Sequence, residues 1–273
     1  MNSSVLVIMT CFNRKDKTLT CVETLVRGNK KLSFEFLVVD DKSTDGTREA
    51  LEELSRNQDI AITVLTTLGD CFWSGGMRVG MNYAKLHKKA EYCLLVNDDV
   101  RFYHSCIQSM MNDCNADVLV GSTHDENGKL SYSGIHYRKR SIKYELVMPG
   151  EETLDCDTFN ANCVLMPYEI FLEIPSIDPY YVHGLGDFDY GLSIKKAGIR
   201  IRCFNRYVGI CNNNSTTGTW LDTSLSRSDR FRKKEHPKGQ PTKQWFYFLR
   251  KNFGLWKAIF YSLTPFVRIM IKK

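Results

Sequence analysis

A short apolar run that ends in two adjacent carboxylates constrains the fold of this chain more than any other feature. Residues 92–96 (Tyr-Cys-Leu-Leu-Val) lead directly into Asn97, Asp98 and Asp99. Such a run, followed at once by polar residues, is typical of a strand buried on both faces of a parallel sheet. In open α/β sheets ligands bind beyond the carboxyl ends of the strands, so we expect Asp98 and Asp99 to enter a binding crevice.

Two neighbouring carboxylates repel each other unless a positive charge lies between them. A divalent cation with oxygen ligands is the simplest partner, which makes Asp98 and Asp99 candidate metal ligands. The alternative is a plain turn, because Asn97 and Asp98 are residue types that hydrogen-bond their own backbone in turns. The run alone leaves both interpretations open.

Three further apolar runs precede this one, and helical patterns separate them. The expected strands are residues 5–9, 34–39, 60–65 and 92–96, and the helical patterns include residues 18–25, 50–54 and 76–86. Asp45 is a candidate cap for the second of these helices. Strands that alternate with single helices imply right-handed crossovers and a parallel sheet covered on both faces. The polar ends of the strands then lie along one edge, which brings together residues 10–14, 40–45 and 97–99.

The composition fits a globular chain with a real core. The chain has 273 residues, of which 43% are hydrophobic, enough for one large domain or a domain with a tail. Its ten cysteines are scattered and include no Cys-x-x-Cys pair, which argues against a zinc knuckle or a redox pair. A reducing cytosol is the simplest compartment. The N-terminal residues do not have the pattern of a signal peptide.

The polar edge suits a nucleotide, yet the common nucleotide-binding motifs are absent from the sequence. No GxGxxG follows the first strand, and no GxxxxGK[ST] occurs. The glycine-rich segment that is present, residues 73–76 (Trp-Ser-Gly-Gly), precedes a helix, and its amides could face an anion. A glycine pair is as often just a tight turn.

Taken together, these residues resemble the family 2 glycosyltransferases of the GT-A fold, over about residues 4–210. Four segments in the family's order carry the resemblance: 7–14, 38–45, 73–76 and 97–99. It implies an α/β fold of the Rossmann-like nucleotide-diphospho-sugar transferase type, with a mixed, mainly parallel sheet flanked by helices and a C-terminal helical tail. It also implies that the nucleotide is bound by Thr10, Phe12, Asn13, Arg14, Asp41 and Asp98.

The same resemblance implies which residues bind the metal ion and which contact the sugar. Asp99 is expected to bind a divalent ion, Mn²⁺ or Mg²⁺, and Asp98 to contact the ribose or help with the metal. The glycine-rich segment is similar to a loop of the rhamnosyl- and galactofuranosyl-transferase branch. The residues expected to contact the donor or acceptor there are Trp73, Ser74, Gly75 and Gly76. The branch makes dTDP-rhamnose the first expected donor and a UDP-hexose or UDP-galactofuranose the second.

A second acidic segment lies at the front of a helix expected near residue 187. The resemblance places the family's base motif here, with Asp187 as the general base and Gly186 where the family usually has a first acid. Asp189 is expected to orient the helix or the acceptor, and it is the base if the register differs. From the residues alone, Asp187 can also be a plain helix N-terminal carboxylate stabilised by the helix dipole.

One family feature is missing. Members often supply a histidine as a further metal ligand after the helix that follows the base, but residues 207–214 contain none. The metal is then either bound through substrate oxygens and water, or less strictly required. His183 is near Asp187 in sequence, and we interpret it as structural.

We expect the chain to divide into a catalytic domain, residues 1–222, and a tail, residues 223–273. Residues 1–100 form its nucleotide-binding half and residues 101–222 its acceptor-binding half. The tail is first basic, then aromatic, then apolar, and Lys257, Pro265 and Arg268 interrupt the apolar part, so it falls short of a membrane-spanning helix. A helix lying in the membrane interface fits this pattern, and a packed helix with a solvated basic face is the alternative. Nucleic acid is the less favoured partner, because no recognised module accompanies the basic residues.

We therefore expect a cytoplasmic, inverting, metal-dependent hexosyltransferase at the inner face of a bacterial membrane. It would extend a saccharide or lipid-linked saccharide acceptor in capsule or O-antigen synthesis. A one-step displacement needs one base, whereas a glycosidase needs an acid and a base that straddle the bond. The competing interpretation is a sugar-nucleotide or carbohydrate-binding protein without turnover, favoured by Gly186 and the missing histidine.

Overall fold

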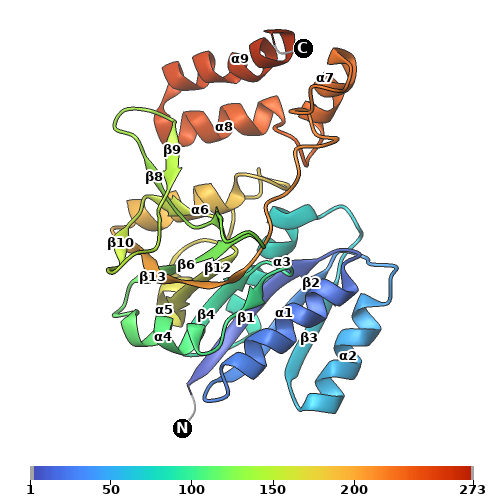
Figure 1. The fold of residues 1–273 in the computed structure, drawn as a ribbon, viewed down its shortest axis with the longest axis vertical. Helices are drawn as coiled ribbons and strands as arrows, with labels where there is room; N and C mark the ends of the chain where they lie inside the picture. The colour runs from blue at the N-terminus through green and yellow to red at the C-terminus, as the bar shows by residue number, and fades with distance from the viewer. Residues whose placement is uncertain (1–2, 272–273) are drawn as a thin grey trace.

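The structure, a computed structural model, describes residues 3–271. A central mixed sheet carries helices on both faces, and a helical hairpin from the C-terminal tail forms the end of the molecule opposite the N-terminus (Figure 1). The first part of the chain alternates strand and helix: β1 (Ser4–Cys11), α1 (Lys15–Gly28), β2 (Ser33–Asp40), α2 (Thr47–Gln58), β3 (Ala61–Thr66), α3 (Phe72–His87) and β4 (Tyr92–Val96).

The second part mixes short strands with three helices. Its elements are β5 (Arg101–Phe102), α4 (Cys106–Asp113), β6 (Val118–His124), β7 (Leu130–Tyr132), β8 (Gly134–Tyr137), β9 (Tyr144–Leu146), β10 (Leu154–Asp155), β11 (Thr158–Phe159), β12 (Cys163–Pro167), α5 (Tyr168–Glu173), α6 (Gly186–Lys196) and β13 (Ile201–Ile210). The tail adds α7 (Arg227–Glu235), α8 (Thr242–Phe253) and α9 (Leu255–Ile271).

The main sheet has the strand order β10-β13-β6-β12-β4-β1-β2-β3, with β5 beside β13 and β7 beside β6. β1 is parallel to both β2 and β4, and β2 is parallel to β3. β12 runs antiparallel between β4 and β6, so the sheet is mixed beyond β4. Because the first four strands are parallel, the polar residues that follow β1, β2 and β4 meet at one edge, as the sequence predicts.

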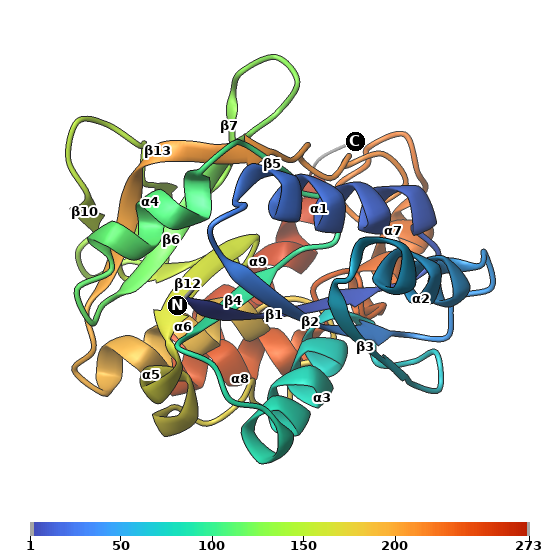
Figure 2. The ribbon, with the colours of Figure 1, turned by 90° about the horizontal axis from the view of Figure 1, so that it is seen from below.

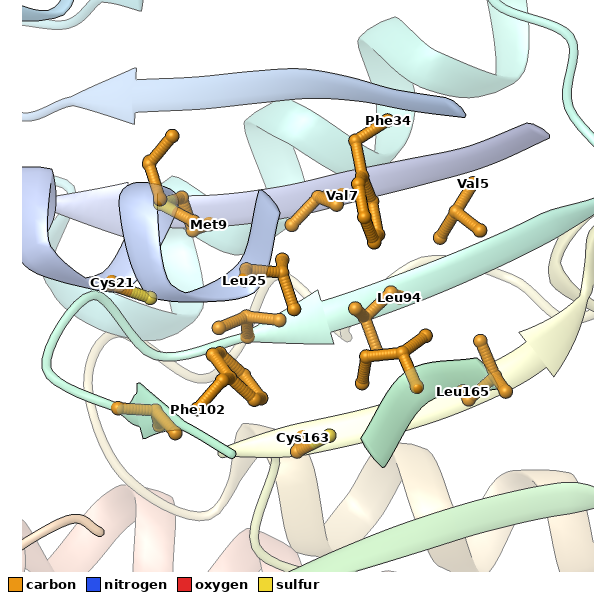
Figure 3. Close-up of a cluster of buried hydrophobic side chains, with 14 of the residues drawn as sticks. Val5, Val7, Met9, Cys21, Leu25, Phe34, Leu94, Phe102, Cys163 and Leu165 are labelled. Atoms are coloured by element: carbon orange, nitrogen blue, oxygen red, sulfur yellow. The ribbon is translucent and has the colours of Figure 1, made fainter. Parts of the chain in front are cut away.

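The strand at residues 92–96 has the predicted bounds and lies between β1 and β12. Its side chains alternate between two buried clusters: Leu94 packs on the face covered by α1, α2 and α4, and Leu95 on the face covered by α3, α5 and α6 (Figure 2). On the first face Leu94 shares a cluster with Val7 of β1 and Leu25 of α1 (Figure 3). Burial on both sides explains why this run has no polar alternation.

The glycine-rich segment at residues 73–76 corrects an expectation. It is not a loop: α3 begins at Phe72, so the segment forms the first turns of that helix. The glycines let the helix approach the sheet closely, since a Cβ on Gly76 would lie 2.3 Å from Thr10 Oγ1 and one on Gly80 2.9 Å from the Ile8 side chain. Packing against β1 therefore accounts for Gly76 without a ligand.

Gly76→Ala is accordingly expected to lower the free energy of unfolding by about 1–3 kcal/mol, because the added methyl group must displace Thr10 from its contact with α3. Urea unfolding would measure the change. Gly150→Ala is the matched control, since no atom lies within 4 Å of the position of its Cβ. Equal stability of the Gly76 variant and the control would show that α3 has room to move away from β1.

The tail packs on α6, and Phe253 of α8 also meets the ring of Tyr137 edge-on, in strand β8 of a second, three-stranded sheet. Phe248 and Leu249 of α8 and Ala258 of α9 form a third buried cluster with Tyr181, against which Phe188 of α6 packs. α9 lies outermost, beyond α8 (Figure 1). Within residues 3–271, none of the helices combines the length and the apolar character that crossing a bilayer would need.

Candidate active site

The three polar loops expected at the sheet edge are in direct contact. The Arg14 guanidinium donates from one nitrogen to Asp98 Oδ1 at 3.1 Å and to Asp99 Oδ2 at 2.9 Å, which joins the end of β1 to the end of β4. Asn13 Oδ1 accepts the amide of Thr44 at 2.7 Å, which joins the same loop to the one after β2. The loops at residues 10–14, 40–45 and 97–99 thus form one site.

Asp45 also connects two of these loops. Its carboxylate accepts the amide of Thr47 at the start of α2 at 3.1 Å, although Gly46 is the residue at the cap position. The second oxygen accepts the amide of Lys15 at the start of α1 at 2.9 Å. The expected capping role is thus shared between the two helices that flank the loops.

Asp98 is the buried member of the acidic pair. Only 5% of the residue is exposed, and Thr18 also donates to its Oδ2 at 3.4 Å. Burial raises the pKa of Asp98 to about 6, in spite of the Arg14 charge, which lowers it; the neighbouring Asp99 raises it further. Arg14 therefore balances two carboxylates with one positive charge.

A cavity of about 160 Å³ opens at this edge. It is lined by Thr10, Cys11, Phe12, Arg14, Asp41, Gly69, Phe72, Trp73, Asp98, His183 and Lys238. Of the residues expected to bind the nucleotide, all but Asn13 line it; Asn13 instead binds the loop after β2. His183 and Lys238 come from distant parts of the chain, and the sequence analysis did not place either in the site.

The carboxylate of Asp41 organises the segment that leads into α3. Its Oδ1 accepts from Thr67 Oγ1 at 2.5 Å and from the amide of Gly69 at 3.1 Å, and its Oδ2 accepts the amide of Phe72 at 2.9 Å. Because one carboxylate accepts all these donors, residues 67–72 are held beside the cavity, which Gly69 and Phe72 line.

Trp73 is the one residue of the glycine-rich segment that lines the cavity. Its indole nitrogen donates to Asn97 Oδ1 at 2.7 Å, next to the acidic pair. Ser74 is fully buried and donates to the carbonyl of His183 at 2.7 Å, while the Gly75 amide donates to the carbonyl of Val182 at 3.2 Å. Ser74 and Gly75 therefore connect α3 to the segment before α6, a structural task that the expected sugar contact did not include.

Asp99 faces a neighbouring cavity of about 390 Å³, between α1 and the chain after β13. Its Oδ1 accepts from the Cys211 thiol at 3.4 Å. Burial raises the pKa of that thiol, so it remains a neutral donor and not a thiolate ligand. Arg14 lies between the two cavities, in contact with the carboxylate of each.

Asp187 lies in the first turn of α6, as expected. Its Oδ1 accepts the amide of Phe188 at 2.9 Å and its Oδ2 the amide of Ala161 at 3.4 Å. Burial without a cationic partner raises the pKa of Asp187 to about 6. Asp187, within the described part of the chain, lines neither of the two cavities. It is connected to the acidic pair through the backbone: Ala161 donates to Asp187, and the carbonyl of the next residue, Asn162, accepts the amide of Asn97 at 3.3 Å.

Asp189 has a different environment. It is 2% exposed, and its oxygens accept from Lys251 Nζ at 2.6 Å and Asn252 Nδ2 at 2.8 Å, both on α8. Through these bonds the Asp189 carboxylate holds the tail on α6. The geometry therefore favours Asp187 over Asp189 as a base.

Gly186 has a structural explanation, whereas His183, interpreted from the sequence as structural, lines the cavity. A Cβ on Gly186 would lie 2.4 Å from Ser74 Oγ, so an acidic side chain has no room at this position. Burial and the positive charge of Lys238 lower the pKa of His183 to about 4, which keeps the imidazole neutral. Within the described chain, His183 Nδ1 is buried without a hydrogen-bond partner.

Asp98 and Asp99 fit a divalent ion whose other ligands are substrate oxygens and water. Across residues 3–271 no group of three or more Asp, Glu, His or Cys side chains is arranged to hold a metal. Mg²⁺ is commonly held by one or two carboxylates together with substrate phosphates and water. Asp98 and Asp99 supply two carboxylates that already share one cationic group, Arg14.

Comparison with known proteins gives a family and a fold. The family described as "Glycosyl transferase family 2" matches residues 6–171. A poly(ribitol-phosphate) beta-glucosyltransferase of Bacillus spizizenii (strain W23) is 25% identical over 127 residues, which are 45% of this chain and 19% of that protein. The chain thus spans less than a fifth of the length of this curated relative.

Two solved structures cover nearly all of the chain. S. aureus TarS 1-349 in complex with UDP-GlcNAc has a TM-score of 0.59 at 15% identity and covers 96% of this chain and 74% of its own. The mannosyltransferase PcManGT from Pyrobaculum calidifontis, in complex with GDP-Man and Mn²⁺, has a TM-score of 0.57 at 14% identity, with 98% and 76% covered. At these identities the likeness concerns the fold, and it confirms the expected GT-A class.

Proposed function

The chain belongs to glycosyl transferase family 2, and from this premise we propose that it transfers a sugar from a nucleotide diphosphate sugar to an acceptor hydroxyl with inversion. The observation that carries the proposal is the convergence of the loops after β1, β2 and β4 on one cavity, with Arg14 between Asp98 and Asp99. A nucleotide requires polar contacts at its base and ribose, together with cations at its phosphates. The loops of this edge provide both kinds of group.

In the proposed reaction Asp187 removes the proton from the attacking hydroxyl. A pKa of about 6 leaves Asp187 ionised near neutral pH and still basic enough to accept a proton. Attack on the face of the sugar opposite the leaving diphosphate inverts the anomeric centre in one step. Asp98 and Asp99 would hold a divalent ion, which when bound offsets the negative charge that develops on the diphosphate.

The donor is proposed as a pyrimidine nucleotide sugar. dTDP-rhamnose was expected from the glycine-rich segment, but that segment is part of α3 and its Ser74 is buried. A UDP-hexose gains support from the glucosyltransferase relative and from the UDP-GlcNAc complex of TarS. The acceptor is proposed as a surface polymer or its lipid-linked precursor, in line with the poly(ribitol-phosphate) named for the relative.

A turnover assay tests the activity. Purified protein would be incubated with UDP-glucose, UDP-GlcNAc, UDP-galactofuranose and dTDP-rhamnose, with and without Mn²⁺ and with lipid-linked or polymeric acceptors, and release of nucleoside diphosphate would be measured. Acceptor-dependent release from one donor supports the proposal. Nucleotide binding without release under all these conditions would favour the binding protein that Gly186 and the missing histidine first suggested.

We also propose that the tail, from residue 223, places the enzyme on an anionic membrane surface. The outer side of α9 is apolar along its length; its exposed members are Leu255, Trp256, Ile259, Phe260, Leu263, Val267, Met270 and Ile271. Residues 236–273 contain eight Lys or Arg and no Asp or Glu. An apolar helix face flanked by basic residues matches the interface of an anionic bilayer, where a lipid-linked acceptor would also lie.

Co-sedimentation with vesicles is the measurement for this proposal. The protein is expected to bind phosphatidylglycerol-containing vesicles and to bind phosphatidylcholine vesicles weakly. Trp256→Ser with Phe260→Ser should weaken binding at least about tenfold, since each buried large apolar side chain contributes about 1.5–3 kcal/mol. Leu86→Ser, on α3 at 79% exposure, is the matched control. Unchanged binding by the double variant would disprove this orientation of α9.

A further inference from the structure

We propose that Lys238, carried by the loop between α7 and α8, binds the diphosphate of the donor. The inference rests on the proposed function and adds a residue from the tail to the nucleotide site. Lys238 lines the same cavity as Arg14, Asp41 and Asp98, although more than 130 residues separate it from each of them in the sequence.

The loop that carries Lys238 is a tight, hydrogen-bonded turn. The Gly239 amide donates to the carbonyl of His236 at 2.7 Å, and the Gln240 amide donates to the carbonyl of Lys234 at 2.9 Å. A Cβ on Gly239 would lie 2.2 Å from the carbonyl oxygen of Lys233, so only glycine allows the chain to pass here. The turn therefore fixes the position of the Lys238 backbone.

A buried ammonium group anchors the same turn. Lys234 is fully buried, and its Nζ donates to the Gln240 carbonyl at 3.0 Å and to Thr242 Oγ1 at 2.7 Å, beside an ion pair with Glu235. On the other side the ring of His236 meets the ring of Phe72 edge-on, with centroids 6.1 Å apart. Phe72 begins α3, so the turn is supported from both the tail and α3.

The charge balance of the site calls for another cation. Asp41, Asp98 and Asp99 place three carboxylates around the cavity and its neighbour, and Arg14 already pairs with two of them. A diphosphate adds further negative charge, so with three carboxylates, one arginine and one divalent ion the site would still carry a net negative charge. Within the described chain the ammonium of Lys238 has neither a hydrogen bond nor an ion pair, and it is free to meet an anion.

His183 supplies a second group beside this lysine. Its imidazole is kept neutral by burial and by the nearby charge of Lys238, and its buried Nδ1 has no partner in the described chain. A neutral imidazole offers one donor and one acceptor without adding charge. Lys238 and His183 thus line the same cavity as Arg14, with hydrogen-bonding capacity that the described chain leaves unused.

Paired ligands test this proposal directly. Calorimetry would compare UDP with uridine, and dTDP with thymidine, for the wild type, Lys238→Ala, Lys238→Arg and Lys243→Ala. Lys243 is an exposed lysine in the first turn of α8 that does not line the cavity, and it serves as the matched control. Lys238→Ala should weaken diphosphate binding about tenfold or more and leave nucleoside binding unchanged. Lys238→Arg should restore most of the loss.

The salt dependence gives a second readout. Loss of one phosphate contact should make the fall of nucleotide affinity with salt shallower in Lys238→Ala than in the control. Equal loss of nucleoside and diphosphate binding, or no loss at all, would overturn the assignment of Lys238 and leave the proposed function standing. A wild type that binds neither UDP nor dTDP would overturn the proposed function itself, and this inference with it.

Discussion

Asp187→Asn is expected to reduce sugar transfer by about 10²–10⁴-fold, the usual contribution of a positioned general base. Asparagine keeps the shape of the side chain and an oxygen that accepts the Phe188 amide, but it cannot take up the proton of the acceptor. Donor affinity should stay within about twofold of the wild type, because Asp187 does not line the nucleotide cavity. Initial rates and nucleotide titrations would measure the two quantities separately.

The pH dependence of kcat/KM tests whether Asp187 is the general base. Because the carboxylate must be ionised, kcat/KM of the wild type should rise with pH up to about 6 and then level off. The variant should lose the part of this limb that Asp187 contributes, whereas any part due to Asp98, whose pKa is also raised to about 6, should remain. Unfolding of the variant is the control for folding. Burial raises the pKa of Asp187 to about 6, so its ionisation destabilises the fold as pH rises from about 4 to about 6, and the penalty is constant above that. The variant should therefore be up to about 3 kcal/mol more stable than the wild type at pH 8 and lose that advantage towards pH 4. Full transfer activity of a well-folded variant would place the base elsewhere.

Asp99→Asn is the second large effect. If Asp99 holds the divalent ion, the variant should transfer sugar about 10²–10³-fold more slowly, since metal stabilisation of the leaving group contributes several kcal/mol. Arg14 would keep its contact with Asp98, so the loops should remain in place. A binding readout is independent of turnover: Mn²⁺ should tighten UDP binding to the wild type and have little effect on the variant.

Asp16→Asn provides the matched control for this experiment. Asp16 lines the same cavity as Asp99 but belongs to the first turn of α1, and within residues 3–271 its carboxylate forms no ion pair with Arg14. Asp16→Asn removes one negative charge from the same cavity as Asp99→Asn does, so a purely electrostatic effect on nucleotide affinity would appear in both variants. Mn²⁺-dependent UDP binding that survives in Asp99→Asn would exclude Asp99 as the metal ligand.

The strands and the edge they form were predictable because their signals are local. A continuous apolar run such as residues 92–96 can only be a doubly buried strand or a buried helix segment, and its length decides between them. The direction of the parallel strands then places the acidic loops together. α4 was missed although it carried a signal: Cys106, Ile107, Met110 and Met111 are buried at helical spacing.

Other parts of the site depend on packing that no local pattern encodes. The glycines at 75–76 have the composition of a loop, and only the approach of Thr10 explains Gly76 as a helix residue. His183 and Lys238 reach the cavity from segments without periodicity, so their place depends on the tertiary fold. Asp189 looked like a second candidate base, and its contacts with Lys251 and Asn252 could be known only once α8 was placed.

Those contacts tie the first turn of α6 to the tail through a carboxylate that has almost no access to water. Truncating the chain before α8 is a common way to remove a membrane-binding segment. Here it would leave the buried carboxylate of Asp189 without its partners and lower the free energy of unfolding by about 3–5 kcal/mol. Activity lost by such a truncated protein would report a disturbed α6 as much as detachment from a bilayer. Point substitutions on the outer side of α9 separate the two, because they leave Lys251 and Asn252 in place.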